Sequence, residues 1–111
     1  MSKTRELVTF DEKGHYAWLV WCPACDGPHM FDNRWTFNGD HVAPTFRASM
    51  LAHEIPGVKP RCHSYLTDGV WQYLADCGHP LAGQSAPAPD WASTRWANMR
   101  PDGVVPSGEA P

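Results

Sequence analysis

All four cysteines of this chain fall in three short clusters, and two of the clusters also contain a histidine. The clusters are Cys22-Pro23-Ala24-Cys25, Cys62-His63 and Cys77-Gly78-His79. A chain of 111 residues builds only a small hydrophobic core, and such cores usually need a covalent or metal cross-link. We therefore expect these cysteines and histidines to provide that cross-link, which limits the fold to one that brings the three clusters together.

A metal ion is the expected cross-link, although an even number of cysteines is also compatible with disulfide bonds. The first ten residues carry charges without the apolar segment of a secretory signal, and no apolar run approaches membrane-spanning length. The expected location is therefore the cytoplasm. In that reducing compartment, clustered cysteine and histidine indicate metal binding before disulfides, and we predict Zn²⁺ as the cofactor.

The predicted zinc ligands come from one tight turn and from the two ends of a predicted hairpin. A CxxC turn directs two thiolates at one tetrahedral centre. Neighbouring strand residues point to opposite faces, so only one of Cys62 and His63 can reach a given metal. The preferred ligand set leaves no open position, which makes the zinc structural. The set is Cys22, Cys25, Cys62 and Cys77, with His79 or His63 as the alternative ligand.

Aromatic and β-branched runs predict a mostly β fold, namely a small zinc-stapled antiparallel domain of zinc-ribbon-like or small-barrel form. The clearest signal is the turn Thr67-Asp68-Gly69 between strands over 61–66 and 70–74, because Asp-Gly between such runs is typical of a hairpin. Further strands are expected over 8–10, 15–21, 29–31, 35–37 and 45–52. In the last of these, alternation places Phe46, Ala48 and Met50 on the apolar face, opposite Ser49.

Composition divides the chain near residue 84. Six of the eleven prolines lie at or after Pro80, and residues 84–111 have no sustained apolar period. We predict a zinc-binding β domain over residues 1–84 and an irregular Pro/Ala-rich C-terminal arm over residues 85–111, in which only 91–99 has the pattern of a short helix.

The charge pattern bears on the partner. The formal net charge is −3, and the nine lysines and arginines are scattered along the chain. A protein that neutralises phosphates needs a basic face, so nucleic acid is not the expected partner, and no membrane contact is predicted. Exposed loops, tryptophans and the proline-rich arm instead favour a protein partner or a peptide substrate.

Five segments in the same order resemble a family of small phage and bacterial proteins of long-unassigned function, sometimes mislabelled ammonia monooxygenase. The segments are CPACDGPHMF, WTFNGDHVAPTF, Ser49, RCHSYLTDG and DCGHPLAGQ, and the resemblance covers roughly residues 16–85. Around the serine the family often has PTFSPS, where this chain has Pro44-Thr45-Phe46-Arg47-Ala48-Ser49. This short chain looks like the stand-alone phage members, which implies a host-cell cytoplasmic location.

The resemblance also implies a possible activity. Larger relatives occur in bacterial operons that encode ubiquitin-like proteins with their activating and conjugating enzymes, and these relatives are proposed to be peptidases that process or remove the modifier. Two interpretations follow for this chain. One is a protein-interaction module in which the zinc is structural, and the other is a peptidase-type hydrolase.

The hydrolase interpretation takes one of two forms. In the first, Ser49 is the nucleophile, His63 is the base, and Asp76 or His79 orients the base. Ser64 is the weaker nucleophile, because adjacent strand residues face opposite sides. In the second form the zinc keeps an open position for water beside Cys22, Cys25 and either His63 or His79, and the candidate base is Glu54 or Asp76.

Overall fold

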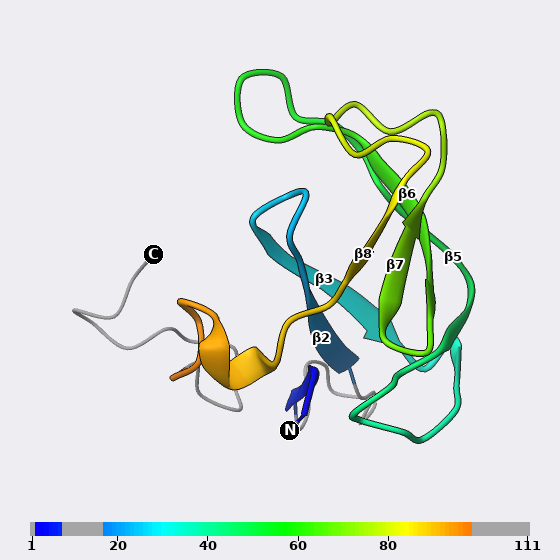
Figure 1. Cartoon of the computed structure of the whole chain (residues 1–111), viewed down its shortest axis with the longest axis vertical. Helices are drawn as coiled ribbons and strands as arrows, with labels where there is room; N and C mark the ends of the chain where they lie inside the picture. The colour runs from blue at the N-terminus through cyan, green and yellow to red at the C-terminus, as the bar shows by residue number, and fades with distance from the viewer. Residues whose placement is uncertain (1, 8–16, 99–111) are drawn as a thin grey trace.

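The computed structural model describes residues 2–7 and 17–98, which form two antiparallel β-sheets and one short 3-10 helix (Figure 1). The predicted mostly β, antiparallel fold is thereby confirmed. The strand expected over residues 8–10 lies outside the described residues. Within the described part of the chain, no helix is long and apolar enough to span a membrane.

The smaller sheet has three strands in the order β1 (Thr4–Leu7), β2 (Ala17–Cys22) and β3 (Gly27–Asp32). Strands β2 and β3 pair in register from Ala17 opposite Asp32 to Cys22 opposite Gly27. The CxxC segment therefore forms the connection between them. This hairpin confirms the strand and return strand predicted on either side of the first cysteine cluster.

The larger sheet has five strands in the order β4 (Thr36–Phe37), β5 (Phe46–Ala52), β6 (Cys62–Thr67), β7 (Val70–Tyr73) and β8 (Ser85–Pro87). Strands β6 and β7 form the predicted hairpin. Asp68 and Gly69 at its turn have φ angles of 50° and 78°. Two consecutive positive φ angles are what a two-residue hairpin turn of type I′ requires, which is why Asp-Gly is favoured there.

Strand β5 contains a bulge that changes the predicted alternation of its side chains. Phe46 pairs with Leu66 and Met50 pairs with Ser64, so residues 47–49 of β5 lie opposite Tyr65 alone. Phe46 and Met50 are buried as predicted. The prediction for Ala48 was wrong, because the bulge interrupts the period of two and Ala48 is exposed.

The two sheets pack face to face through aromatic side chains. Phe31 of β3 stacks on Phe46 of β5, with ring centroids 4.2 Å apart. Trp71 of β7 is fully buried, and its indole Nε1 donates a hydrogen bond to the Trp21 carbonyl at 2.8 Å. These contacts fix the β2–β3 hairpin against the five-stranded sheet, so that the CxxC turn lies near the start of β6.

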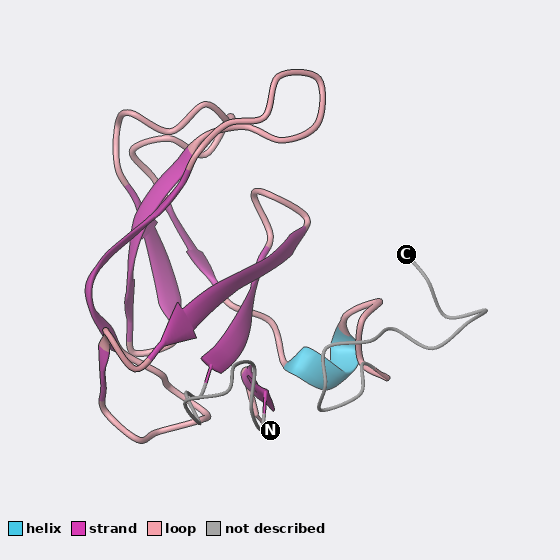
Figure 2. Cartoon of the chain, turned by 180° about the vertical axis from the view of Figure 1, so that it is seen from behind, coloured by secondary structure: helices cyan, strands magenta, loops and turns pink. Residues whose placement is uncertain are grey.

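Part of the predicted C-terminal arm belongs to the folded structure. Strand β8 pairs with β7, and the 3-10 helix η1 (Trp91–Ser93) follows it. Trp91 is buried against Trp21 of β2, and its backbone N–H donates to the Ser2 carbonyl at 2.9 Å. Figure 2 shows the helix at the end of the molecule where the N-terminal strand begins. The division of the chain at residue 84 stays a prediction, and it falls directly before β8.

Candidate active site and metal centre

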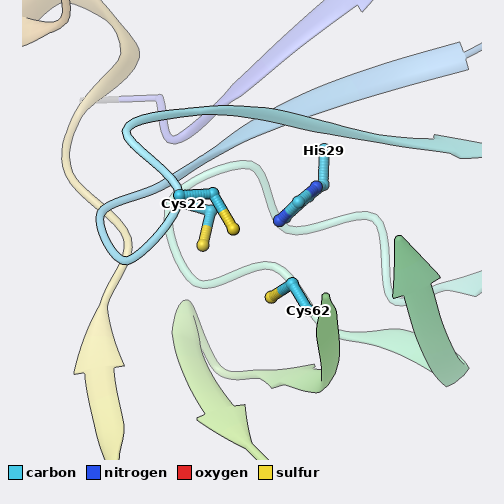
Figure 3. Close-up of side chains that lie close together, drawn as sticks. Cys22, His29 and Cys62 are labelled. Atoms are coloured by element: carbon cyan, nitrogen blue, oxygen red, sulfur yellow. The ribbon is translucent and has the colours of Figure 1, made fainter. Parts of the chain in front are cut away.

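Three cysteines and one histidine converge between the β2–β3 hairpin and the start of β6. Cys22 ends β2, Cys25 lies in the turn, His29 lies in β3, and Cys62 begins β6. One ligand atom from each residue lies within 4.8 Å of those of the other three. Figure 3 shows the side chains of Cys22, His29 and Cys62 gathered around one space. All four cysteines of the chain are free thiols.

The three thiols of this group influence one another's ionisation. A hydrogen bond from Cys25, and then one from Cys62, lowers the pKa of Cys22. The hydrogen bond to Cys22 raises the pKa of Cys25 to about 12. Hydrogen bonds to Cys22 and Cys25 raise the pKa of Cys62. One thiolate at Cys22 is thus stabilised by two protonated neighbours. A bound divalent cation would deprotonate all three, because coordination favours the thiolate form.

His29 provides a separate indication that the group fits a metal. The residue is only 9% exposed, and its Nε2 is buried without a hydrogen-bond partner among the described residues. A buried polar atom without a partner is costly, and metal coordination would satisfy it. The Cys-His group can therefore hold a metal ion. The sequence contains one indication that His29 lies near the cysteines, because His29 follows the CxxC segment on the return strand. His29 is nevertheless absent from the predicted ligand set.

Cys77, which was predicted as the fourth thiolate, lies in a second group that shares Cys62. This group contains Cys62, Cys77 and His79, again with ligand atoms within 4.8 Å of one another. The Cys77 thiol accepts a hydrogen bond from the His63 backbone N–H at 3.2 Å and donates one to the His63 carbonyl at 3.1 Å. The structure thus gathers three of the four predicted thiols with His29, while Cys77 contacts the backbone at His63.

His79 also has a buried Nε2 without a hydrogen-bond partner among the described residues, whereas its Nδ1 accepts a hydrogen bond from the Leu81 N–H at 3.3 Å. That bond favours the tautomer in which Nε2 carries the proton. In that form Nε2 can donate a hydrogen bond but has no lone pair with which to bind a metal. This chemistry separates His79 from His29, whose hydrogen bond with Cys22 is one of the causes that lower the pKa of that thiol.

His63 lies next to Cys62 in β6, and its side chain takes part in a different set of contacts. Its Nε2 is 3.3 Å from the Ser49 hydroxyl oxygen. Its Nδ1 is 3.1 Å and 3.2 Å from the two carboxylate oxygens of Asp76. Ser49 comes from the β5 bulge, and Asp76 comes from the segment after β7. The structure therefore brings together the three residues predicted as nucleophile, base and orienting group, and places His63 in neither metal-ligand group.

The electrostatics of Asp76 favour an ionised carboxylate. Desolvation raises its pKa, but hydrogen bonds from Arg61 and His63 outweigh this effect and hold the pKa below its ordinary value. Arg61 Nη2 donates to the carboxylate at 3.1 Å. An ionised carboxylate accepts a hydrogen bond from Nδ1–H of His63, which leaves the lone pair of Nε2 facing Ser49.

The Ser49–His63–Asp76 group is open to solvent. The side chains of His63 and Asp76 are 27% and 46% exposed, and Ser49 is half-buried. Ser64, the weaker candidate nucleophile, is fully buried beside the Cys62 thiol. A hydroxyl in that position has no access to a substrate, whereas the Ser49 hydroxyl lies at the surface.

A serine hydroxyl, an imidazole and a carboxylate in hydrogen-bond sequence are the arrangement of the serine hydrolases, here on a small two-sheet scaffold with a separate Cys-His centre. Comparison with protein families gives the narrower assignment. A family model described as bacterial ubiquitination-like system serine protease (BubE) matches residues 1–74, and the chain belongs to this family. Comparison with curated proteins and with solved structures found no match.

The family assignment confirms the resemblance to peptidases of bacterial ubiquitin-like operons that the sequence motifs indicated. Ser49 and His63 lie inside the matched segment, whereas Asp76 lies two residues beyond its end. The position of Asp76 beside His63 therefore rests on its contacts with His63 and Arg61 and not on the family match.

Proposed function

We propose that this protein is a serine peptidase in which Ser49 is the nucleophile, His63 the general base and Asp76 the group that orients the base. One observation carries the proposal, namely the continuous hydrogen-bond path from the Ser49 hydroxyl through both ring nitrogens of His63 to the Asp76 carboxylate. The serine protease description of the family supports the same assignment.

The proposed reaction uses each residue in the role that its contacts allow. His63 Nε2 takes the proton of Ser49 as the hydroxyl oxygen attacks the peptide carbonyl carbon, and an acyl-enzyme forms when the C–N bond breaks. The protonated His63 then donates that proton to the leaving amine. Water, deprotonated by His63, hydrolyses the ester and regenerates Ser49. Asp76 stays ionised throughout and stabilises the imidazolium.

We further propose that the Cys-His group holds Zn²⁺ in a structural role. Three sulfur ligands and one nitrogen ligand, Cys22, Cys25, Cys62 and His29, make a tetrahedral set typical of zinc without an open position for water. This set argues against the alternative in which the metal carries out the hydrolysis. Because Cys62 immediately precedes His63, a bound metal would also fix the backbone that carries the base, and such rigid support favours catalysis.

The protein-interaction module, the other function predicted from the sequence, remains a prediction, as does the cytoplasmic location. We favour the peptidase because a binding module does not require an oriented imidazole beside an accessible hydroxyl. The partner expected for this site is a peptide substrate.

A fluorophosphonate probe tests the proposed nucleophile directly, because it reacts with activated serine hydroxyls. We expect one covalent adduct per chain, located at Ser49 by peptide mass spectrometry. The Ser49→Ala and His63→Ala variants should not react, whereas Ser93→Ala, which changes an exposed serine of the 3-10 helix, should react like the natural protein. Absence of an adduct, or an adduct at another serine, would contradict the proposed mechanism.

Two buried histidines provide a matched test of the proposed fourth ligand. Loss of an outer-sphere hydrogen bond typically lowers metal affinity by roughly 10- to 100-fold. We expect His29→Ala to lower zinc affinity by more than this. The loss of zinc affinity in His79→Ala should stay within this range. Zinc affinity is measured by competition with a chromogenic chelator. Retention of zinc in His29→Ala together with its loss in His79→Ala would exchange the two assignments.

A further inference from the structure

Strand β5 has an unpaired edge beside the proposed nucleophile. On the side away from β6, β5 pairs only with the short strand β4, through Phe46 and Arg47. Beyond Arg47, no strand of the described residues lies on that side. Figure 1 shows β5 curving along the outer side of β6. Ser49 and the rest of β5, up to Ala52, thus form a strand segment with one free edge.

The backbone of Leu51 faces this free edge. Leu51 lies directly opposite His63 in the β5–β6 pair. The His63 carbonyl accepts a hydrogen bond from the Leu74 N–H at 2.9 Å, and the His63 N–H donates to Cys77, so both backbone groups of His63 face away from β5. Opposite residues in an antiparallel pair exchange either both hydrogen bonds or neither. The N–H and C=O of Leu51 therefore point away from β6, and neither has a partner among the described residues.

The free edge of β5 begins after Ser49, because the side chain of Trp35 occupies the Ser49 carbonyl. The indole Nε1 of Trp35 donates to the Ser49 carbonyl at 3.4 Å, so this acceptor is already used. Leu51 is the next residue whose backbone faces outward, because outward-facing residues alternate along a strand. A free donor and acceptor pair therefore lies two residues from the nucleophile. Unpaired strand edges of this kind bind another extended chain.

Side chains around this edge favour apolar contact with the bound chain. Leu51 and Tyr65 are 39% and 37% exposed, although both are large and hydrophobic. Leu51 is paired with His63, and Tyr65 is the residue of β6 opposite the β5 bulge that contains Ser49. Apolar surface thus lies on both sides of the proposed catalytic base.

We propose that the substrate is an extended polypeptide segment that adds to β5 as a further strand, hydrogen-bonded to Leu51, with its scissile carbonyl at Ser49. This inference rests on the proposed peptidase function and specifies its substrate class. Strand addition requires a segment with free backbone groups, such as a chain terminus or a flexible loop. A stretch already paired within a folded domain does not meet this requirement.

N-methylation of the substrate tests the inference on the unmodified protein. A synthetic library of randomised, unstructured, fluorescence-quenched peptides identifies a cleaved sequence, and each amide of that sequence is then N-methylated singly. We expect sensitivity to alternate with a period of two near the scissile bond, because only every second amide of an added strand faces β5. Methylation at a sensitive position should lower kcat/KM by at least about tenfold, the effect of one lost hydrogen bond together with the added bulk.

Leu51→Pro is the complementary change on the protein. It removes the outward N–H, and a proline is tolerated where the N–H does not pair within the sheet. We expect kcat/KM for the same peptide to fall by about tenfold or more, by the same reasoning. Zinc content and melting temperature, measured on the same sample, show whether the variant is folded.

The outcomes separate this inference from the function on which it rests. Failure of the fluorophosphonate probe to label Ser49 would overturn the peptidase itself. If Ser49 is labelled, three results would overturn strand addition alone: no library peptide is cleaved, sensitivity to methylation lacks the period of two, or folded Leu51→Pro cleaves the peptide as well as the natural protein does.

Discussion

The Ser49→Ala and His63→Ala variants are expected to lose peptide hydrolysis while they keep their metal and their fold. Removal of either member of such a triad typically lowers kcat by at least about 10⁴-fold, and the remaining rate comes from binding and electrostatic stabilisation. The double variant should be no slower than either single one, because the two residues act as a unit. Steady-state hydrolysis of a cleaved peptide provides the rates, and elemental analysis provides the metal content.

The informative control for His63 is its neighbour in the chain. Cys62→Ser changes an adjacent residue of β6 whose side chain points into the metal-ligand group, so we expect it to lose zinc and stability. His63→Ala should instead retain zinc and melt close to the natural protein. Loss of zinc from His63→Ala would make His63 a ligand, and the proposed separation of metal and catalytic groups would then be wrong.

Removal of the metal has the second largest expected effect. The protein purified without chelators should contain one zinc ion per chain, and removal of that ion by a strong chelator should unfold the domain. The physical reason is that structural zinc contributes on the order of 10 kcal/mol of apparent binding free energy, which exceeds the stability of most small domains. Circular dichroism melting curves, recorded with and without chelator and after addition of zinc, measure the effect.

Cys22→Ser is the corresponding variant, because Cys22 is fully buried and contacts the Tyr73 hydroxyl at 3.1 Å as well as the other ligands. It should reproduce the behaviour of the chelated protein, whereas Ser49→Ala should melt like the natural chain. A protein that contains no metal as purified, and whose melting temperature a chelator leaves unchanged, would contradict the structural role of zinc.

Much of the fold follows from local patterns in the sequence. The β6–β7 hairpin is predicted by Asp68-Gly69 because these residues accept the positive φ angles of the turn. The β2–β3 hairpin is predicted by the CxxC segment and the turn that follows it. The exposure of Ala48 could not be predicted, because a bulge arises from the register between β5 and β6 and not from the residues of β5 alone.

Only part of the candidate site follows from local patterns in the sequence. Alternation along a strand correctly separates Cys62 from His63 and directs the latter toward Ser49 and Asp76. The members of the Cys-His group depend instead on how the two sheets pack, and no local sequence pattern gives that packing. The packing places His29 of β3 among three thiols and leaves Cys77 against the His63 backbone. The spacing of the cysteines predicts the three thiols of this group, and it also predicts Cys77, which the packing places in the second group.

The contact between Trp91 and the N-terminal segment has a consequence for biosynthesis. Trp91 covers Trp21 on the outer face of β2, and its N–H donates a hydrogen bond to the carbonyl of Ser2, 89 residues earlier in the chain. A ribosome releases Ser2 and Trp21 long before it adds Trp91, and domains fold as the chain emerges. Trp21 therefore stays uncovered on that face until Trp91 has been synthesised, so this contact forms after the strands that precede Trp91 in the chain.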